Sequence, residues 1–91
     1  MLIPSSFELG GFKWKVVRRK RLKDKYGDCN LAKLEIQILD TLEQELKEQT
    51  FLHELTHAIQ FAMGIEQANH NEQFTDAFAM YLHQYMKTAK E

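Results

Sequence analysis

The stretch Phe51–Phe61, FLHELTHAIQF, decides how the rest of the chain is interpreted. His53 and His57 are four residues apart, about one turn of an α-helix, so both imidazoles project from the same helix face. Glu54 lies about 100° further round the helix than His53. Two imidazoles on one face can converge on a single metal ion, and a neighbouring carboxylate can reach a water bound to it. The stretch therefore predicts a helix that carries part of a metal centre.

Two stretches before this helix have the alternating pattern of half-buried β-strands. In the first, FELGGFKWKVV, the pair Gly10 and Gly11 supplies the positive φ angles of a tight hairpin turn. The apolar positions that alternate with lysine after this turn are Phe12, Trp14 and Val16. In the second, AKLEIQIL, the alternating apolar positions are Leu34, Ile36 and Ile38. The basic connection between them, RRKRLKDKYGDCN, is expected to turn at Gly27.

After the second strand the pattern changes to helical spacing. Asp40 and Glu43 form a capping-box pattern, which predicts that the helix begins there. It is expected to run up to Gly64, which can end it in a left-handed cap. A last helix is expected to begin within residues 69–71 and to reach Lys87. Its apolar positions, which we expect in the core, are Phe74, Phe78, Tyr81, Leu82 and Tyr85.

Strands followed by two helices predict an α+β fold, in which a small three- to four-stranded sheet packs on the metal-centre helix and on a C-terminal helix. The 91 residues are expected to form one domain, 1–91. A formal charge of −1 gives the chain no field that attracts polyanions. We find neither a signal-peptide pattern nor an apolar run of membrane-spanning length, so we expect a cytoplasmic protein without a membrane partner. The single cysteine, Cys29, fits a reducing compartment.

A catalytic zinc site has three protein ligands in a tetrahedral arrangement and leaves the fourth position to water. Glu72 follows His57 by fifteen residues and stands at the start of the last predicted helix. The intervening loop, GIEQANHN, is long enough to return this helix to the two histidines, so Glu72 is our candidate for the third ligand. His70, in the same loop, is the alternative. On the last helix, Asp76 lies one turn after Glu72 on the same face.

The motif HELTH followed by NEQFTD resembles the active site of gluzincin zinc metallopeptidases, in which HExxH is joined by a downstream glutamate in a pattern like NExxSD, as in thermolysin. The stretch EQFTDAFA is also similar to the ImmA/IrrE peptidases and to the minimal gluzincins of microbes and phages. This resemblance implies that His53, His57 and Glu72 bind Zn²⁺. It further implies that Glu54 is the general base that activates the zinc-bound water for peptide-bond hydrolysis.

The same resemblance assigns supporting roles to two residues beside the glutamate ligand. Asp76 would hold His53, and Asn71 would hold His57, through the ring nitrogens that face away from the metal. Such contacts fix the tautomer and the plane of a ligating imidazole. The alternative for Asp76 is a contact with solvent or with the end of the last helix alone.

A metallopeptidase of this kind is expected to take a peptide or protein substrate and to hold it in extended form against a sheet edge beside the cleft. Our candidates for that edge are Gly27, Asp28 and Cys29. The thiol of Cys29 has two alternative roles, as a cap on the zinc in a latent form or as a buried group without a function. His83, on the last helix, is expected to be a packed core residue.

Two other functions stay open at this point. SprT-like metalloproteases, which act at DNA, use a histidine as the third ligand; a resemblance to them would give that role to His70 and a DNA contact to the basic run Arg18–Lys25. A basic run between strands is more often solvated, so we expect no nucleic-acid partner. The other alternative is a zinc-stabilised binding or regulatory module without turnover, which has no use for a carboxylate such as Glu54 beside its ligands. The sequence predicts no oligomeric state.

Overall fold

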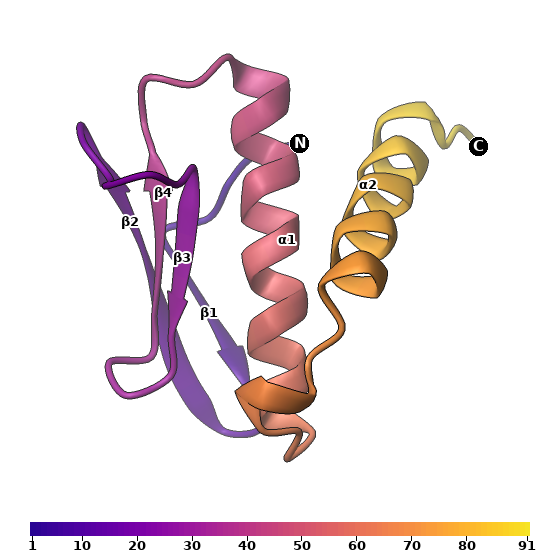
Figure 1. Ribbon diagram of the computed structural model, residues 1–91. Coiled ribbons are helices and arrows are strands. Elements are labelled where there is room, and N and C mark those ends of the chain that lie inside the picture. Colours follow the sequence, from indigo (N-terminus) through magenta and orange to yellow (C-terminus); the bar gives the residue numbers. More distant parts are fainter.

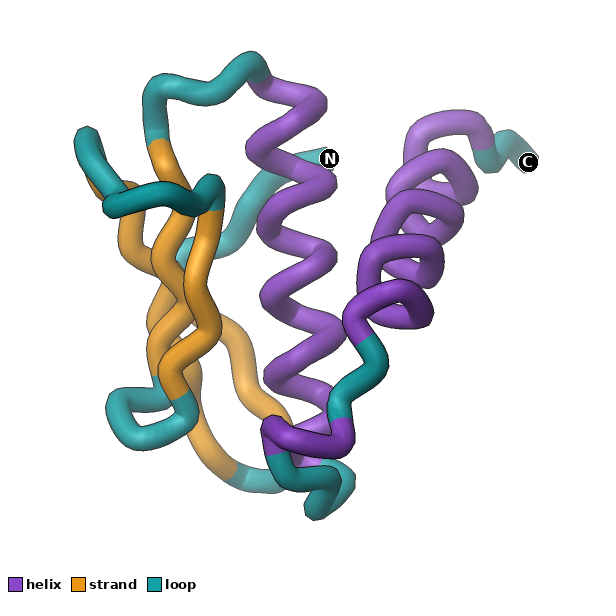
Figure 2. The backbone as a smooth tube through the Cα atoms, viewed as in Figure 1, coloured by secondary structure: helices purple, strands orange, loops and turns teal.

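Helix α1 lies between a four-stranded sheet and a second long helix, α2 (Figure 1). The computed structural model describes residues 1–91. The elements in chain order are β1 (Ser6–Leu9), β2 (Phe12–Arg19), β3 (Gly27–Asn30), β4 (Glu35–Leu39), α1 (Gln44–Ala62), the 3₁₀ turn η1 (Gln67–Asn69) and α2 (Glu72–Thr88). Figure 2 shows the strands in one layer beside α1 and α2 on the opposite side of that helix. The predicted α+β fold is confirmed. Neither long helix combines the length and the apolar character needed to cross a lipid bilayer.

The sheet has the order β1-β2-β4-β3, which leaves β3 at an edge. β1 and β2 pair antiparallel through a turn at Gly10 and Gly11, whose φ angles of +56° and +84° confirm the predicted hairpin. β2 pairs with β4 in parallel, and β3 pairs antiparallel with β4 on its other side. The outer edge of β3 therefore carries backbone N–H and C=O groups that no other strand of this chain pairs.

The core lies where the inner face of the sheet meets α1. Ile36 and Ile38 are fully buried, as the alternation in β4 predicted, and Trp14 is buried on the neighbouring strand β2. The helices contribute the buried apolar side chains of Phe51, Leu52, Ala58 and Ala79. Three of these four come from α1, so this helix is held on both sides and its position relative to the sheet is determined by the core.

The two ends of α1 differ in how well the sequence predicts them. The helix begins at Gln44 and not at Asp40, because the Asp40 carboxylate accepts from Arg18 and Lys47, each at 3.3 Å, and does not cap the helix. The capping-box prediction is therefore wrong. Gly64, with φ +84°, ends the helix in the left-handed conformation, as predicted.

The aromatic stripe of α2, predicted as core, lies on the outside of the molecule. Phe74, Phe78, Tyr81 and Tyr85 are all exposed. The side of α2 that faces α1 buries smaller or polar residues instead, namely Thr75, Ala79 and His83. The prediction was wrong for these four aromatic residues, because helical spacing identifies a shared face but says nothing about which face the neighbouring helix covers. Leu82, the fifth predicted position, is partly buried and packs against the core.

A buried hydrogen bond between His83 and Glu48 joins the two helices near the far end of α2. Nε2 of His83 donates to Oε1 of Glu48 at 2.8 Å, and both side chains are almost fully enclosed. Gln44 donates to the other carboxylate oxygen at 3.1 Å, and the amino group of Met1 lies 3.8 Å from it. The hydrogen bond from His83, and then that from Gln44, lowers the pKa of Glu48 below its ordinary value of 4.5. The prediction of a core histidine at position 83 is confirmed.

Glu48→Gln should lower the free energy of unfolding at pH 7 by about 1.5–3 kcal/mol, the contribution of a hydrogen bond to a charged group. Because the pKa of Glu48 is lowered on folding, the stability that its carboxylate contributes is present above pH 4.5 and is lost as the pH falls through the folded-state pKa. Urea unfolding at neutral and at acidic pH measures both values. The difference between wild type and variant should shrink in acid, whereas Glu8→Gln, at an exposed position on β1, should match the wild type at both pH values. A pH-independent difference would contradict this role of the ionised Glu48.

Candidate metal centre

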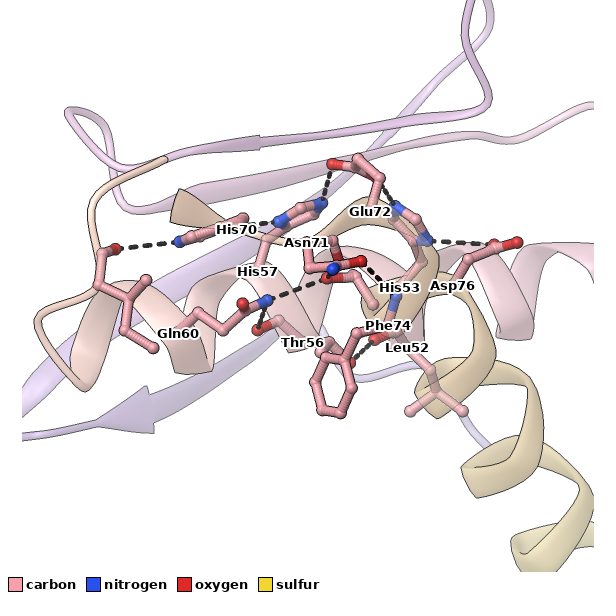
Figure 3. Close-up of polar contacts among 12 residues, drawn as sticks. Leu52, His53, Thr56, His57, Gln60, His70, Asn71, Glu72, Phe74 and Asp76 are labelled. Carbon is pink, nitrogen blue, oxygen red and sulfur yellow. Dashed lines mark hydrogen bonds and ion pairs between the residues drawn. The ribbon is translucent and has the colours of Figure 1, made fainter. Parts of the chain in front are cut away.

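The imidazoles of His53 and His57 point from α1 at the carboxylate of Glu72, the first residue of α2 (Figure 3). Nε2 of His53 lies 3.3 Å from Oε2 of Glu72, and Nε2 of His57 lies 2.9 Å from Oε1. One ligand atom from each of the three residues lies within 4.8 Å of the others. Ligands about 2.1 Å from a tetrahedral zinc ion are about 3.4 Å apart, so the three side chains fit one ion of this size.

The surroundings of His53 favour a cation between these three groups. Nδ1 of His53 lies 3.4 Å from Oδ1 of Asp76, on the side of the ring away from Glu72. Both ring nitrogens of His53 thus face carboxylates, which have only acceptors, and a neutral ring can donate a proton to one of them alone, so its other nitrogen presents a lone pair to a carboxylate. A lone pair and a carboxylate repel each other unless a cation lies between them. Asp76 thus has the contact with His53 that the motif resemblance implied.

His57 is held by a different neighbour from the one expected. Its Nδ1 lies 2.7 Å from Nδ1 of His70, whose Nε2 lies 3.0 Å from the carbonyl oxygen of Ile65. The side chain of Asn71 instead caps α2, because its oxygen accepts from the backbone N–H of Phe74 at 2.9 Å. His70 therefore sits behind the ring of His57, and Asn71 determines where α2 begins.

Two buried polar residues that the sequence analysis did not select hold the start of α2 against α1. Nε2 of Gln60 donates to the hydroxyl of Thr75 at 3.1 Å, and that hydroxyl donates to the carbonyl oxygen of Asn71 at 2.9 Å. Thr75 is fully buried. The available signal was its spacing: Thr75 and Ala79 are one turn apart, on a side of α2 away from the aromatic residues. This contact places Glu72 in front of the histidines.

Glu54 lies in the wall of a narrow cleft beside the three ligand residues. Glu54 is only 8% exposed. Burial raises the pKa of Glu54 to about 8, and the nearby carboxylates of Asp28 and Glu72 add to the effect. The cleft has a volume of about 190 Å³ and is lined by Gly27, Asp28, Cys29, His53, Glu54, His57, Phe61, Gln67 and Glu72. The candidate ligands, Glu54 and the three candidate substrate-binding residues thus line one cavity.

Gly27 allows strand β3 to approach α1 closely. A Cβ atom at this position would lie 2.6 Å from Cγ2 of Thr50 and 3.1 Å from Cγ of Glu54, closer than side chains pack. Gly27 begins β3 and does not form the predicted turn, because its lack of a side chain is needed for packing. A second cleft of about 430 Å³ continues past Gly27 on the other side of Glu54, towards Asp76. The space beside Glu54 is therefore open along the direction of β3.

Cys29 faces the cleft with a thiol that resists ionisation. Burial, followed by the carboxylates of Glu54 and Asp28, raises the pKa of Cys29 to about 12. The thiolate form is the nucleophile, so in the metal-free chain the neutral thiol of Cys29 is poorly reactive.

The comparison with protein families decides between the families considered above. The model of the SprT-like family matches residues 5–89, which include every strand, both long helices and all residues of the candidate centre. The chain belongs to the SprT-like family. This is a zinc metalloprotease-like family, so the SprT-like domain carries a candidate metal site of a kind that the family leads one to expect. Comparisons with curated proteins and with solved structures gave no match. The likeness to gluzincins and to ImmA/IrrE peptidases stays a resemblance of motif.

Glu72→Ala should weaken zinc binding by this SprT-like chain more than His70→Ala does, because only Glu72 offers an atom to the same ion as both Nε2 atoms. Losing a group that only orients a ligand costs about 10–100-fold in metal affinity, and losing a ligand should cost more. Titration with a competing chelator measures both variants. A larger loss for His70→Ala would make His70 the third ligand.

Asp76→Ala should lower zinc affinity by about 10–100-fold while the fold persists, since the ring of His53 loses the group that favours its ligand tautomer. Asp76→Asn keeps an acceptor oxygen of the same length and should retain more of the affinity. Chelator competition and circular dichroism on both variants test this. Unchanged affinity in folded Asp76→Ala would leave Asp76 as a surface charge.

Proposed function

We propose that this chain is a zinc-dependent metallopeptidase that hydrolyses peptide bonds in a peptide or protein substrate. The observation that carries the proposal is the convergence of two imidazole nitrogens and one carboxylate beside a buried glutamate in a single cleft. His53, His57 and Glu72 would hold the ion, and their two nitrogens and one oxygen are a donor set that suits Zn²⁺. Bound zinc polarises the scissile carbonyl group and lowers the pKa of water.

Glu54 would act as the general base and then as the general acid. It follows the ligand His53 directly and lines the same cleft, yet it contributes no atom to the group of three ligand residues. As the water oxygen bonds to the carbonyl carbon, the Glu54 carboxylate takes a water proton. It returns a proton to the amide nitrogen as the carbon–nitrogen bond breaks, so the amine leaves in neutral form. A purely structural site gains nothing from such a carboxylate, which supports turnover over the non-catalytic binding module.

The substrate backbone would pair with the free edge of β3. This strand is unpaired on its outer side, and Gly27, Asp28 and Cys29 from it line the cleft that holds Glu54. An added strand receives main-chain hydrogen bonds from such an edge, which positions a scissile bond without reading particular side chains. The cavities on both sides of Glu54 leave room for residues before and after that bond.

Membership of the SprT-like family favours a second candidate, in which the substrates are proteins bound to DNA. Within the basic run, Arg18, Arg19 and Lys25 pair with carboxylates of the same chain. The exposed cations of this run with no ion pair are Lys20, Arg21 and Lys23. Salt-dependent binding to duplex DNA that is lost when these three are changed to serine would support this candidate, and no binding at low salt would remove it.

Glu54→Gln should keep zinc but reduce peptidase activity by about 10²–10⁴-fold, because the amide preserves the shape of the side chain and cannot accept the proton. Zinc content by mass spectrometry and cleavage of a peptide library on the same sample measure both properties. The control is Glu43→Gln, at an exposed glutamate that makes no capping hydrogen bond. Turnover by zinc-loaded Glu54→Gln equal to that of the control would remove Glu54 from the mechanism.

A further inference from the structure

His70 is packed against the metal centre without facing the ion. Its ring stacks on that of His57 with centroids 5.0 Å apart and planes 13° apart, and it lies 4.5 Å from the ring of Phe61. Figure 3 shows His57 between Glu72 on one side and His70 on the other. Nδ1 of His57 faces Nδ1 of His70 at 2.7 Å, while Nε2 of His57 faces Glu72 at 2.9 Å. The two nitrogens of His57 therefore have separate partners.

The backbone carbonyl of Ile65, which contacts His70, determines which ring nitrogens of His70 and His57 carry protons. A carbonyl oxygen can only accept, so Nε2 of His70 donates to Ile65, and Nδ1 of a neutral His70 is an acceptor. The proton between the two rings then belongs to Nδ1 of His57. A neutral His57 is left with its lone pair on Nε2, the atom that faces Glu72.

We infer that His70 is a positioning residue that selects the metal-binding tautomer of His57 through the carbonyl group of Ile65. The inference rests on the proposed metal site and gives His70 a role that is distinct from that of third ligand. The position of this carbonyl is itself fixed, because the N–H of Ile65 donates to the backbone carbonyl oxygen of Gln60 at 2.9 Å. This hydrogen bond forms just after Gly64 ends the helix. The left-handed cap of α1 thus also anchors the support of its second histidine.

Nitrogen-15 NMR of labelled histidines measures the tautomers of His57 and His70 directly in the metal-free protein near pH 8. The expected spectrum has the proton of His57 on Nδ1 and that of His70 on Nε2, and added zinc should then shift Nε2 of His57 while both nitrogens of His70 stay free of metal. A His70 nitrogen that moves to the shift of a zinc-bound imidazole nitrogen, or a proton on Nε2 of His57, would overturn the inference. A wild-type protein that binds no zinc would defeat the proposed function, while the tautomers of the metal-free protein would still decide the role of His70.

Two variants separate the hydrogen bond of His70 from its packing. His70→Phe keeps a ring against Phe61 and removes the acceptor, so zinc affinity should fall by about 10–100-fold. His70→Gln keeps an acceptor oxygen and should retain more of the affinity. Equal affinity for wild type and folded His70→Phe would contradict the positioning role.

A second inference comes from the surface of α2 and is independent of the metal. The aromatic stripe consists of Phe74, Phe78, Tyr81 and Tyr85, which are 54%, 45%, 67% and 67% exposed. Successive members are separated by four, three and four residues, so all four lie within about 60° of one another round the helix. Alternating steps of three and four are the spacing of the seam between two packed helices.

We propose that the aromatic stripe binds the same stripe of a second copy of this chain. In such a two-fold contact each copy presents the same residues, so a seam with an excess of charge of one sign would repel its own copy. Between Phe74 and Tyr85 the only Asp, Glu, Lys or Arg is Asp76, whose carboxylate faces His53, so the stripe itself carries no charge and is compatible with a second copy. Aromatic enrichment with few charges is also the composition of interface centres. The opposite side of α2 is already occupied by α1, so the stripe remains accessible in the folded monomer.

Sedimentation velocity over a range of concentrations should show a dimer of the wild-type chain. Phe78→Glu should raise its dissociation constant by at least about 10-fold, since it buries a carboxylate from each copy within the apolar seam. The matched control is Met80→Glu, at an exposed position of α2 outside the stripe, which should leave the dimer intact.

Disulfide cross-linking tests the same contact. In a Cys29→Ser background, Tyr81→Cys should form a disulfide-linked dimer on oxidation and Met80→Cys should not. A wild-type chain that stays monomeric up to about 1 mM, or a dimer that Met80→Cys links and Tyr81→Cys does not, would overturn the proposal.

Discussion

Gln60 on α1 donates to the hydroxyl of Thr75 on α2, and the rest of the centre depends on this buried hydrogen bond. It holds together two helices that pack through small side chains, which allows the first turn of α2 to lie close to the histidines. Because the same hydroxyl also bonds to the carbonyl of Asn71, the start of α2 is tied to the side of α1. Glu72 comes next in the chain, so its backbone is held beside the histidines and its carboxylate, although 70% exposed, lies within reach of both.

The electrostatics of the cleft are consistent with a site built around a cation. Three carboxylates, those of Asp28, Glu54 and Glu72, are close enough that the first and last raise the pKa of the second. Lys25 offsets part of this charge through its hydrogen bond to Asp28 at 2.9 Å. On the other side, Nε2 of His53 and Nε2 of His57 face the Glu72 carboxylate while each Nδ1 has a partner of its own, so a lone pair on either Nε2 is repelled by that carboxylate. A divalent cation among the inward-facing groups would relieve both kinds of repulsion, which links the arrangement of neighbours to the proposed chemistry.

Local patterns predicted those parts of the fold that depend on neighbouring residues in the chain. The turn at Gly10 and Gly11, the alternation that buries Ile36 and Ile38, and the cap at Gly64 each rest on a few consecutive residues. The pairing of His53 with His57 is local too, because one helical turn separates them. The position of Glu72 relative to them depends on how two helices dock, and there only the resemblance to a known motif made the prediction specific.

The features that the sequence did not reveal all depend on residues far apart in the chain. Helix α1 starts later than predicted because Asp40 pairs with Arg18 from β2. The exposure of Tyr81 and its neighbours depends on which side of α2 meets α1. His70 was considered only as a rival ligand, since nothing local shows that its ring stacks behind His57. Zinc K-edge X-ray absorption of the stoichiometric zinc protein tests the centre most directly, because multiple scattering counts imidazole ligands. The proposed centre predicts two imidazoles with oxygen donors and no sulfur. Three imidazoles, or a sulfur ligand, would contradict it.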